Sequence, residues 1–236
     1  MLKSVFIPNK TNAFAWGNVL FLMLLVALGK IEAYAVLFGY FLETIVIGVF
    51  NCFKMYTCHK HNGKGESVMK YILFFIVHYG FFIAVQSVFV FAFFSFDNDG
   101  FVKEPFHLIT NFKAVFQLEG MPLILTFLTV TQLVKYIFDF LLPKKYLKYE
   151  VKEIMFKPYL RIVIQQFTVI LAGFFIIISS GSIAAAMLLI LMRGIVDFIL
   201  VGIRENSEIL EYFVEKSYDG KTPKSELRKQ ILLFTE

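Results

Sequence analysis

Charged residues are scarce in this sequence. Asp, Glu, Lys and Arg make up 17% of its 236 residues, against about 25% in soluble domains. Hydrophobic residues make up 58%, and phenylalanine alone occurs 30 times. So much apolar surface needs lipid to cover it, which excludes an ordinary soluble fold. The net charge of +5 comes from basic residues between apolar runs, not from a basic stripe, so we expect no nucleic-acid partner.

Metal-binding and redox side chains are also few. The two cysteines, Cys52 and Cys58, match no zinc-ribbon or haem-attachment spacing. We expect both at the cytoplasmic end of a helix, where thiols stay reduced and Cys58 is open to labelling. A metal site of Cys58, His59 and His61 is the alternative to a solvated loop, which we favour. His78 is the one histidine in an apolar run, so we expect no bis-histidine haem, no metal and no other cofactor.

The apolar runs predict an all-α fold. A bilayer core about 30 Å thick needs about 20 apolar residues. The sequence has six runs near that length, and no cleavable signal-peptide site follows the first. We therefore expect a polytopic bundle of six transmembrane helices over residues 1–204, followed by a short cytoplasmic tail over residues 205–236. The expected spans are residues 12–29, 33–53, 71–94, 122–142, 158–179 and 182–201.

Lysine and arginine are distributed unevenly between the segments that join these runs. With the N-terminus in the cytoplasm, the inner segments hold 18 Lys and Arg residues and the outer segments hold three. Segments rich in Lys and Arg stay on the cytoplasmic side. The sequence thus predicts a multi-pass protein of the cell membrane with both termini cytoplasmic. Membrane lipids are its expected partners, and a homo-oligomer stays open.

The connecting segments carry local signals. FDNDG, residues 96–100, lacks the ligand pattern of a calcium loop and predicts a turn. Residues 179–182 predict a tight turn between the last two spans. In the tail, Gly220 and Pro223 predict a break between helical segments. Apolar residues at helical spacing predict a short helix on the outer membrane surface, capping the bundle. They are Phe106, Ile109, Phe112 and Phe116.

Ionisable and amide side chains lie inside the apolar runs, where they are costly and usually face the bundle interior. Counted from the nearest inner basic residue at 1.5 Å per residue, Glu43 and Arg193 are roughly 16 Å deep and the others roughly 7 to 13 Å. Five helices thus contribute to one polar layer near the midplane. Its members are Glu43, His78, Lys135, Asp139, Gln166, Arg193 and Asp197, with Arg161 near its inner edge.

Two interpretations of this layer stay open. Lys135 with Asp139, and Arg193 with Asp197, are four residues apart and share a helix face. Such pairs are typical of an ion-pair network that fixes helix packing. Intramembrane charges equally indicate a site for a polar small molecule, an ion or a proton, which is the interpretation we favour.

Glu43 and His78 are expected to face each other, with Arg193 and Asp197 close by, because they lie at similar depth on adjacent antiparallel helices. Such a pair could pass protons, and together with Asp197 it offers an alternative metal site. Three functions follow as hypotheses: a small transporter, an enzyme that acts on a lipid-like or quinone-like substrate, and a structural subunit without chemistry. Catalytic residues stay unknown.

Three segments resemble an uncharacterised family of bacterial multi-pass membrane proteins, a domain of unknown function. Residues 41–55, FLETIVIGVFNCFKM, follow the family pattern W-x-E-x-x-V-x-G-x-x-N in part. VHYGFF at residues 77–82, and PYLRIVI with AGFF within residues 158–175, are the other two segments. The positions that match the first pattern are Glu43, Val46, Gly48 and Asn51.

This resemblance implies membership of a bacterial inner-membrane family and no known activity. It marks Glu43, Asn51, His78 and Arg161 as the residues to test. In the family pattern, histidine is common at the positions of Gln86 and Gln166. If the family binds a metal or haem through those histidines, the resemblance implies that this chain has lost it.

Overall fold

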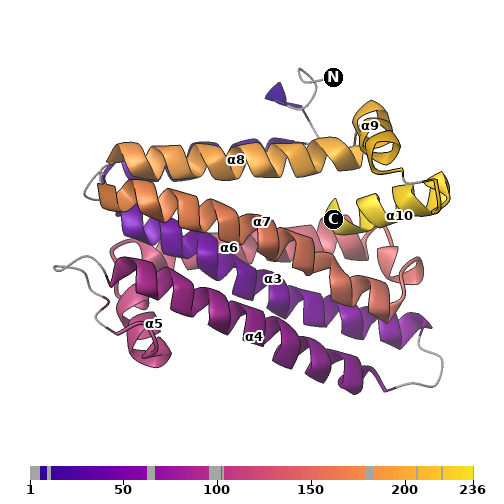
Figure 1. The fold of residues 1–236 in the computed structure, drawn as a ribbon, viewed down its shortest axis with the longest axis horizontal. Helices are drawn as coiled ribbons and strands as arrows, with labels where there is room; N and C mark the ends of the chain where they lie inside the picture. The colour runs from indigo at the N-terminus through magenta and orange to yellow at the C-terminus, as the bar shows by residue number, and fades with distance from the viewer. Residues whose placement is uncertain are drawn as a thin grey trace.

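The computed structural model describes residues 6–9, 12–62, 67–95, 102, 104–178, 183–205, 207–218 and 220–235. These residues form helices and no strand (Figure 1), as expected where lipid leaves backbone groups to bond within the chain. The turns predicted at residues 96–100 and 179–182 lie outside the described residues. The helices are α2 (Ala13–Ala27), α3 (Ala33–Asn62), α4 (Val68–Phe94), α5 (Leu108–Phe116), α6 (Met121–Lys135), the π-helix η1 (Tyr136–Leu141), the 3-10 helix η2 (Lys145–Leu147), α7 (Val151–Ile178), α8 (Ile183–Glu205), α9 (Ser207–Ser217) and α10 (Lys224–Thr235).

Five helical segments among the described residues are long and apolar enough to cross a membrane. They are Tyr34–Asn62, Val68–Ala92, Met121–Leu141, Val151–Leu171 and Ala186–Ile203. α2 has 15 residues and is therefore about 22 Å long at 1.5 Å per residue, shorter than a core of about 30 Å. The all-helical fold is confirmed, whereas a sixth crossing, by α2, stays a prediction.

The helices run past the predicted spans at one end of the bundle. α3 continues to Asn62, α7 begins at Val151 and α8 continues to Glu205. The predicted spans counted apolar positions, but Lys, Glu and Arg are good helix formers, so the helices continue through them. Pro158, expected at the start of a span, therefore lies inside α7.

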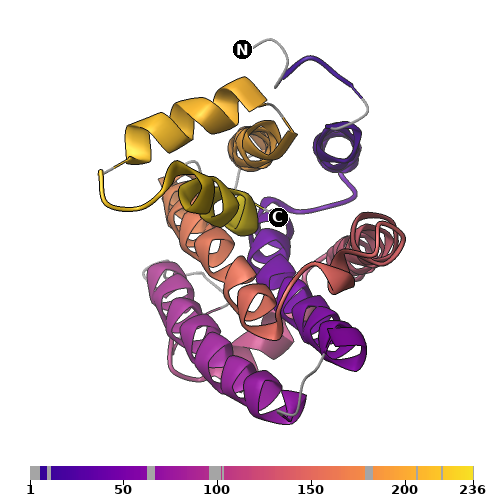
Figure 2. The ribbon, with the colours of Figure 1, turned by 90° about the vertical axis from the view of Figure 1, so that its right-hand side faces the viewer.

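α3 is the central helix of the bundle, and α4 is the most peripheral of the five long ones. The buried share of the apolar window is 61% in α3 and 22% in α4. α3 packs against α4, α6, α7 and α8, while α2 packs on α8. Figure 2 shows α2 and α8 on one side of the bundle and α4 on the opposite side. A polar residue in the first half of α3 is thus surrounded by protein, whereas most of α4 faces outward.

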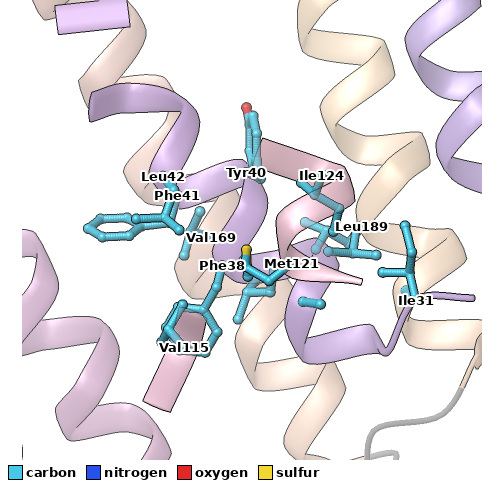
Figure 3. Close-up of a cluster of buried hydrophobic side chains, with 14 of the residues drawn as sticks. Ile31, Phe38, Tyr40, Phe41, Leu42, Val115, Met121, Ile124, Val169 and Leu189 are labelled. Carbon is cyan, nitrogen blue, oxygen red and sulfur yellow. The ribbon is translucent and has the colours of Figure 1, made fainter. Parts of the chain in front are cut away.

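The largest apolar cluster surrounds the first half of α3. Phe38 and Leu37 are fully buried and pack with Met121 and Ile124 of α6 (Figure 3). Val115 of α5 is also fully buried in this cluster, so α5 caps it as predicted. The apolar residues on the other faces of this segment are exposed, in keeping with a position at a lipid surface. They are Phe106, Ile109 and Phe116.

A second cluster fills the opposite end of the bundle, where Met55 and Cys58 of α3 pack with Phe75 of α4 and Ile154 of α7. Cys58 is fully buried, so the expectation that it is open to labelling is wrong. α3 continues well past residue 53, and at position 58 its inward face still meets α7. The thiol is therefore part of the core.

The tail folds back on the bundle. Val214 of α9 is fully buried and packs with Phe198 of α8 and Ala15 of α2. The Lys229 ammonium of α10 lies 2.6 Å from the Glu153 carboxylate of α7, and this hydrogen bond raises the pKa of Lys229. The predicted break is confirmed, because α9 ends at Ser217, Gly220 has a φ of 78° and α10 begins at Lys224.

Gly48 lets α3 and α4 approach closely. A Cβ at this position would lie 2.7 Å from the ring of Tyr79, whose hydroxyl donates to the Thr44 carbonyl at 3.1 Å. Because that ring is held in place, Gly48→Ala should lower the free energy of unfolding by about 1–3 kcal/mol, as overpacking does. Thermal unfolding in detergent measures the change.

The matched control is Gly80→Ala on α4, where a Cβ would meet nothing within 4 Å. Alanine is the better helix former, so this variant should be as stable as the parent or slightly more stable. Equal behaviour of the two variants would show that the α3–α4 contact does not depend on Gly48.

Candidate functional site

A buried carboxylate on the central helix organises the candidate site. The Glu43 side chain is 1% exposed. Arg193 of α8 donates to its Oε2 at 2.7 Å. Arg161 of α7 and Gln132 of α6 each donate to its Oε1 at 3.4 Å. Glu43 thus joins three neighbouring helices to α3 through charge-assisted hydrogen bonds.

Asp197 closes the arrangement. Its Oδ1 accepts a hydrogen bond from Arg161 at 3.3 Å, and its Oδ2 lies 3.8 Å from the Nε of Arg193, one turn earlier on α8. Each arginine therefore contacts both carboxylates. We call these four residues, Glu43, Arg161, Arg193 and Asp197, the charge cluster.

The sequence around Glu43 explains why the cluster forms here. Residues 35–44 of α3 are buried almost without interruption, so no face of the helix can direct a carboxylate to lipid. Tyr40 precedes Glu43 by about one turn, and the Arg193 guanidinium lies 4.8 Å from its ring centroid. Figure 3 shows the Tyr40 hydroxyl directed away from the apolar cluster. Stacking on this ring fixes the orientation of Arg193.

The cluster has one partly open side. The Arg193 side chain is 5% exposed, whereas those of Arg161 and Asp197 are 25% and 13% exposed. The Nε of Arg193 is buried and has no hydrogen-bond partner among the described residues. Lys135, half-buried at the end of α6, interacts electrostatically with all four members of the cluster.

The predicted pairing of Lys135 with Asp139 is wrong. These residues form no ion pair with each other, because Lys135 instead interacts with the carboxylates of Glu43 and Asp197. Lys135 is left near the charge cluster and Asp139 is half-buried elsewhere on η1.

The predicted contact between Glu43 and His78 is also wrong. His78 is exposed, and its Nδ1 hydrogen-bonds to the Tyr159 hydroxyl at 2.7 Å. The inward residue at this level of α4 is Tyr79, and successive residues of a helix are about 100° apart. The acid–base pair and the metal set of Glu43, His78 and Asp197 therefore do not form. In the described part of the chain, no three His, Cys, Asp or Glu side chains converge as a metal site would need.

The predicted amides form no hydrogen bond to the charge cluster in the described part of the chain. Gln86 donates to the Ile162 carbonyl at 3.3 Å, which joins α4 to α7. The Oε1 of Gln166 and the Nδ2 of Asn51 are buried and have no hydrogen-bond partner among the described residues. The amide of α7 that reaches α3 is instead that of Gln165, whose Nε2 donates to the Tyr40 carbonyl.

Sequence reasoning missed three members of the site, Tyr40, Gln132 and Gln165. The spacing of polar residues on α7 contained a signal for one of them. Arg161, Gln165 and Thr168 recur at i, i+4 and i+7, which places them on one helix face. Gln166 is off that face by about 100°.

The fold and the site fit the class of multi-pass helical membrane proteins. Five helical segments have the length and composition to cross a membrane, and the charge cluster is shielded between α3, α6, α7 and α8. Comparison of the sequence with known families identifies the chain further. It belongs to DUF6498, a family of unknown function whose model matches residues 1–211. No curated protein and no solved structure matches the chain. Membership of an uncharacterised family is thus confirmed, while its bacterial origin stays a prediction.

Proposed function

We propose that this protein binds a small monoanion at the charge cluster and carries it across the cell membrane. The observation that supports this proposal is a charge surplus. Arg161, Arg193 and Lys135 bring three positive charges to a site with two carboxylates, Glu43 and Asp197. An unbalanced cation in a lipid-shielded site is costly, and one bound anion would neutralise it.

The partly open side gives the anion an approach. Arg161 and Asp197 are partly exposed, while Glu43 and Arg193 lie behind them. An anion at this edge would meet the partly exposed guanidinium of Arg161, and we place the ammonium of Lys135, which interacts electrostatically with the cluster, at the same edge. Because Arg161 already contacts both carboxylates, binding would redistribute its hydrogen bonds, which is a means of coupling the ligand to helix movement.

A thermal-shift measurement tests binding. The purified protein is heated in detergent with chloride, acetate, lactate or bicarbonate, and with the dianion succinate for comparison, each against the bulky monoanion gluconate at equal ionic strength. A ligand at a hundred times its Kd stabilises the folded state by about 2.7 kcal/mol, so at least one monoanion should raise Tm clearly. Lys135→Met should abolish that rise, because the variant removes the surplus charge, and for the same reason the unliganded variant should be at least as stable as the parent.

Lys148→Met is the matched control, since Lys148 is exposed beyond η2. It should keep the full ligand-dependent shift. A shift that survives in the Lys135→Met variant would contradict an anion site at this lysine.

A structural subunit is the second candidate, and a specific observation favours it. Without Lys135 the four members of the charge cluster are neutral in sum, and each carboxylate contacts both arginines. Such closed networks fix the packing of helices without binding anything. In that case no anion shifts Tm, and Lys135→Met changes neither stability nor ligand response. The enzyme hypothesis has lost the Glu43–His78 pair on which it rested.

We further propose six crossings with both termini cytoplasmic, on the strength of the 18 to three distribution of Lys and Arg. In a background with Cys52→Ser and Cys58→Ala, single cysteines at exposed Lys60 and Lys113 report the two sides. A membrane-impermeant maleimide should label Lys113→Cys in intact cells and Lys60→Cys after permeabilisation alone. The reverse pattern would invert the topology.

A further inference from the structure

His78 occupies an unusual place for an ionisable residue. It is exposed on α4, the long helix with the smallest buried share. The candidate span Val68–Ala92 is centred on residue 80, so His78 lies about 3 Å from mid-span at 1.5 Å per residue. Ionisable residues at this depth almost always face protein or a water-filled cavity, and they mark functional sites.

The surroundings of His78 are aromatic. The ring of Phe74 stacks on the imidazole with 15° between the planes and 5.2 Å between the centroids. Phe82, one turn further on, meets it edge-on at 77° and 5.2 Å. Across on α7, the Tyr159 ring lies 5.5 Å from the imidazole and 5.9 Å from the Phe156 ring. Phe74, Phe82 and Phe156 are themselves 52%, 39% and 48% exposed.

One ring nitrogen of His78 is available. Nδ1 is engaged by the Tyr159 hydroxyl at 2.7 Å, whereas Nε2 has no hydrogen-bond partner in the described part of the chain. We assign the tautomer in which the Tyr159 phenol donates to Nδ1, which places the proton of the neutral imidazole on Nε2 and makes that nitrogen a donor. A free N–H at this depth in hydrocarbon is costly unless an acceptor meets it.

We infer that His78 and Tyr159, framed by Phe74, Phe82 and Phe156, form a lipid-facing site for the head group of a membrane-dissolved quinone. A quinone has a flat apolar ring that fits between aromatic side chains, and its carbonyl oxygen accepts the hydrogen bond from Nε2. An acyl chain has no acceptor for that donor, and a phospholipid head group lies at the membrane surface, far from mid-span. This site is separate from the charge cluster and does not depend on the anion proposal.

Photo-crosslinking tests the inference. The full-length protein in phosphatidylcholine vesicles is irradiated with an azido-benzoquinone that carries a decyl tail, with decyl-benzoquinone as competitor. The label should map to the segments that hold residues 74–82 and 156–159. His78→Leu should reduce competable labelling at least tenfold, because it removes the donor. Tyr159→Phe should reduce it several-fold, because Nδ1 loses its partner and Nε2–H is no longer fixed.

Phe81→Leu is the matched control, since Phe81 is 65% exposed on α4 and should keep full labelling. His78→Leu replaces a polar side chain facing lipid by an apolar one, so the variant should remain folded with an unchanged or higher Tm. Competable labelling that is equal in His78→Leu and the parent would overturn the inference. So would a His78→Leu variant whose main change is loss of a dimer, because the partner of His78 would then be a second copy of the chain.

Discussion

Glu43→Gln should lower the free energy of unfolding by about 3–5 kcal/mol, the loss typical of breaking a buried ion pair. Glu43 is 1% exposed and accepts bonds from two arginines. In this variant Asp197 is the one carboxylate of the charge cluster that remains for Arg161 and Arg193. The positive charge of one buried guanidinium is therefore not compensated. Titration with SDS in mixed micelles, followed by circular dichroism, measures the change. The exposed Glu119 provides the control, because Glu119→Gln should leave stability unchanged.

A double-mutant cycle tests whether the loss of stability in Glu43→Gln comes from its ion pair with Arg193. Replacing Arg193 as well, in Glu43→Gln with Arg193→Gln, removes both charges of the 2.7 Å contact. The double variant should be more stable than the sum of the single losses predicts, because no uncompensated charge remains. Strictly additive losses would mean that Glu43 and Arg193 do not interact in the folded protein.

The two arginines should differ in the effect of their removal. Arg193→Leu should destabilise the protein by about 3–5 kcal/mol, because it leaves Glu43 buried and short of a partner. Arg161 is 25% exposed against 5% for Arg193, and its loss should cost about 1.5–3 kcal/mol, as for a hydrogen bond to a charged group. The same SDS titration measures both variants.

Arg228→Leu is the control for both arginine variants. Arg228 of α10 pairs with Glu211 at an exposed surface, where an ion pair is worth about 0–1 kcal/mol. A larger loss of unfolding free energy in Arg161→Leu than in Arg193→Leu would contradict the expectation that the more buried arginine stabilises the protein more.

The sequence indicates the four charges that gather, although it also places Asp139 and His78 in the same layer. Glu43, Arg161, Arg193 and Asp197 were all candidates, because a charge inside an apolar helix must find a partner and opposite charges at similar depth are the available ones. Depth alone does not give rotation about the helix axis. Apolar residues occur on every face of α4, so its sequence does not indicate which face points into the bundle. The prediction that His78 faces Glu43 is wrong for that reason.

For the fold as well, the sequence predicts the elements better than it predicts how they pack. The apolar runs located the long helices, but not the π-helix after Lys135, which no residue in YIFDFL indicates. The return of α9 and α10 onto the bundle was also missed. It depends on contacts between residues far apart in the chain, such as Val214 with Phe198, which local spacing does not encode.

Uptake by proteoliposomes is the measurement that tests the central claim most directly. Purified protein is reconstituted in phosphatidylcholine vesicles, and entry of the radiolabelled monoanion with the largest Tm shift is followed against protein-free vesicles. The anion proposal predicts saturable uptake that Lys135→Met abolishes and Lys148→Met leaves intact. If no monoanion enters or shifts Tm, while Glu43→Gln still destabilises the protein, the charge cluster is a packing device and the proposed function is wrong.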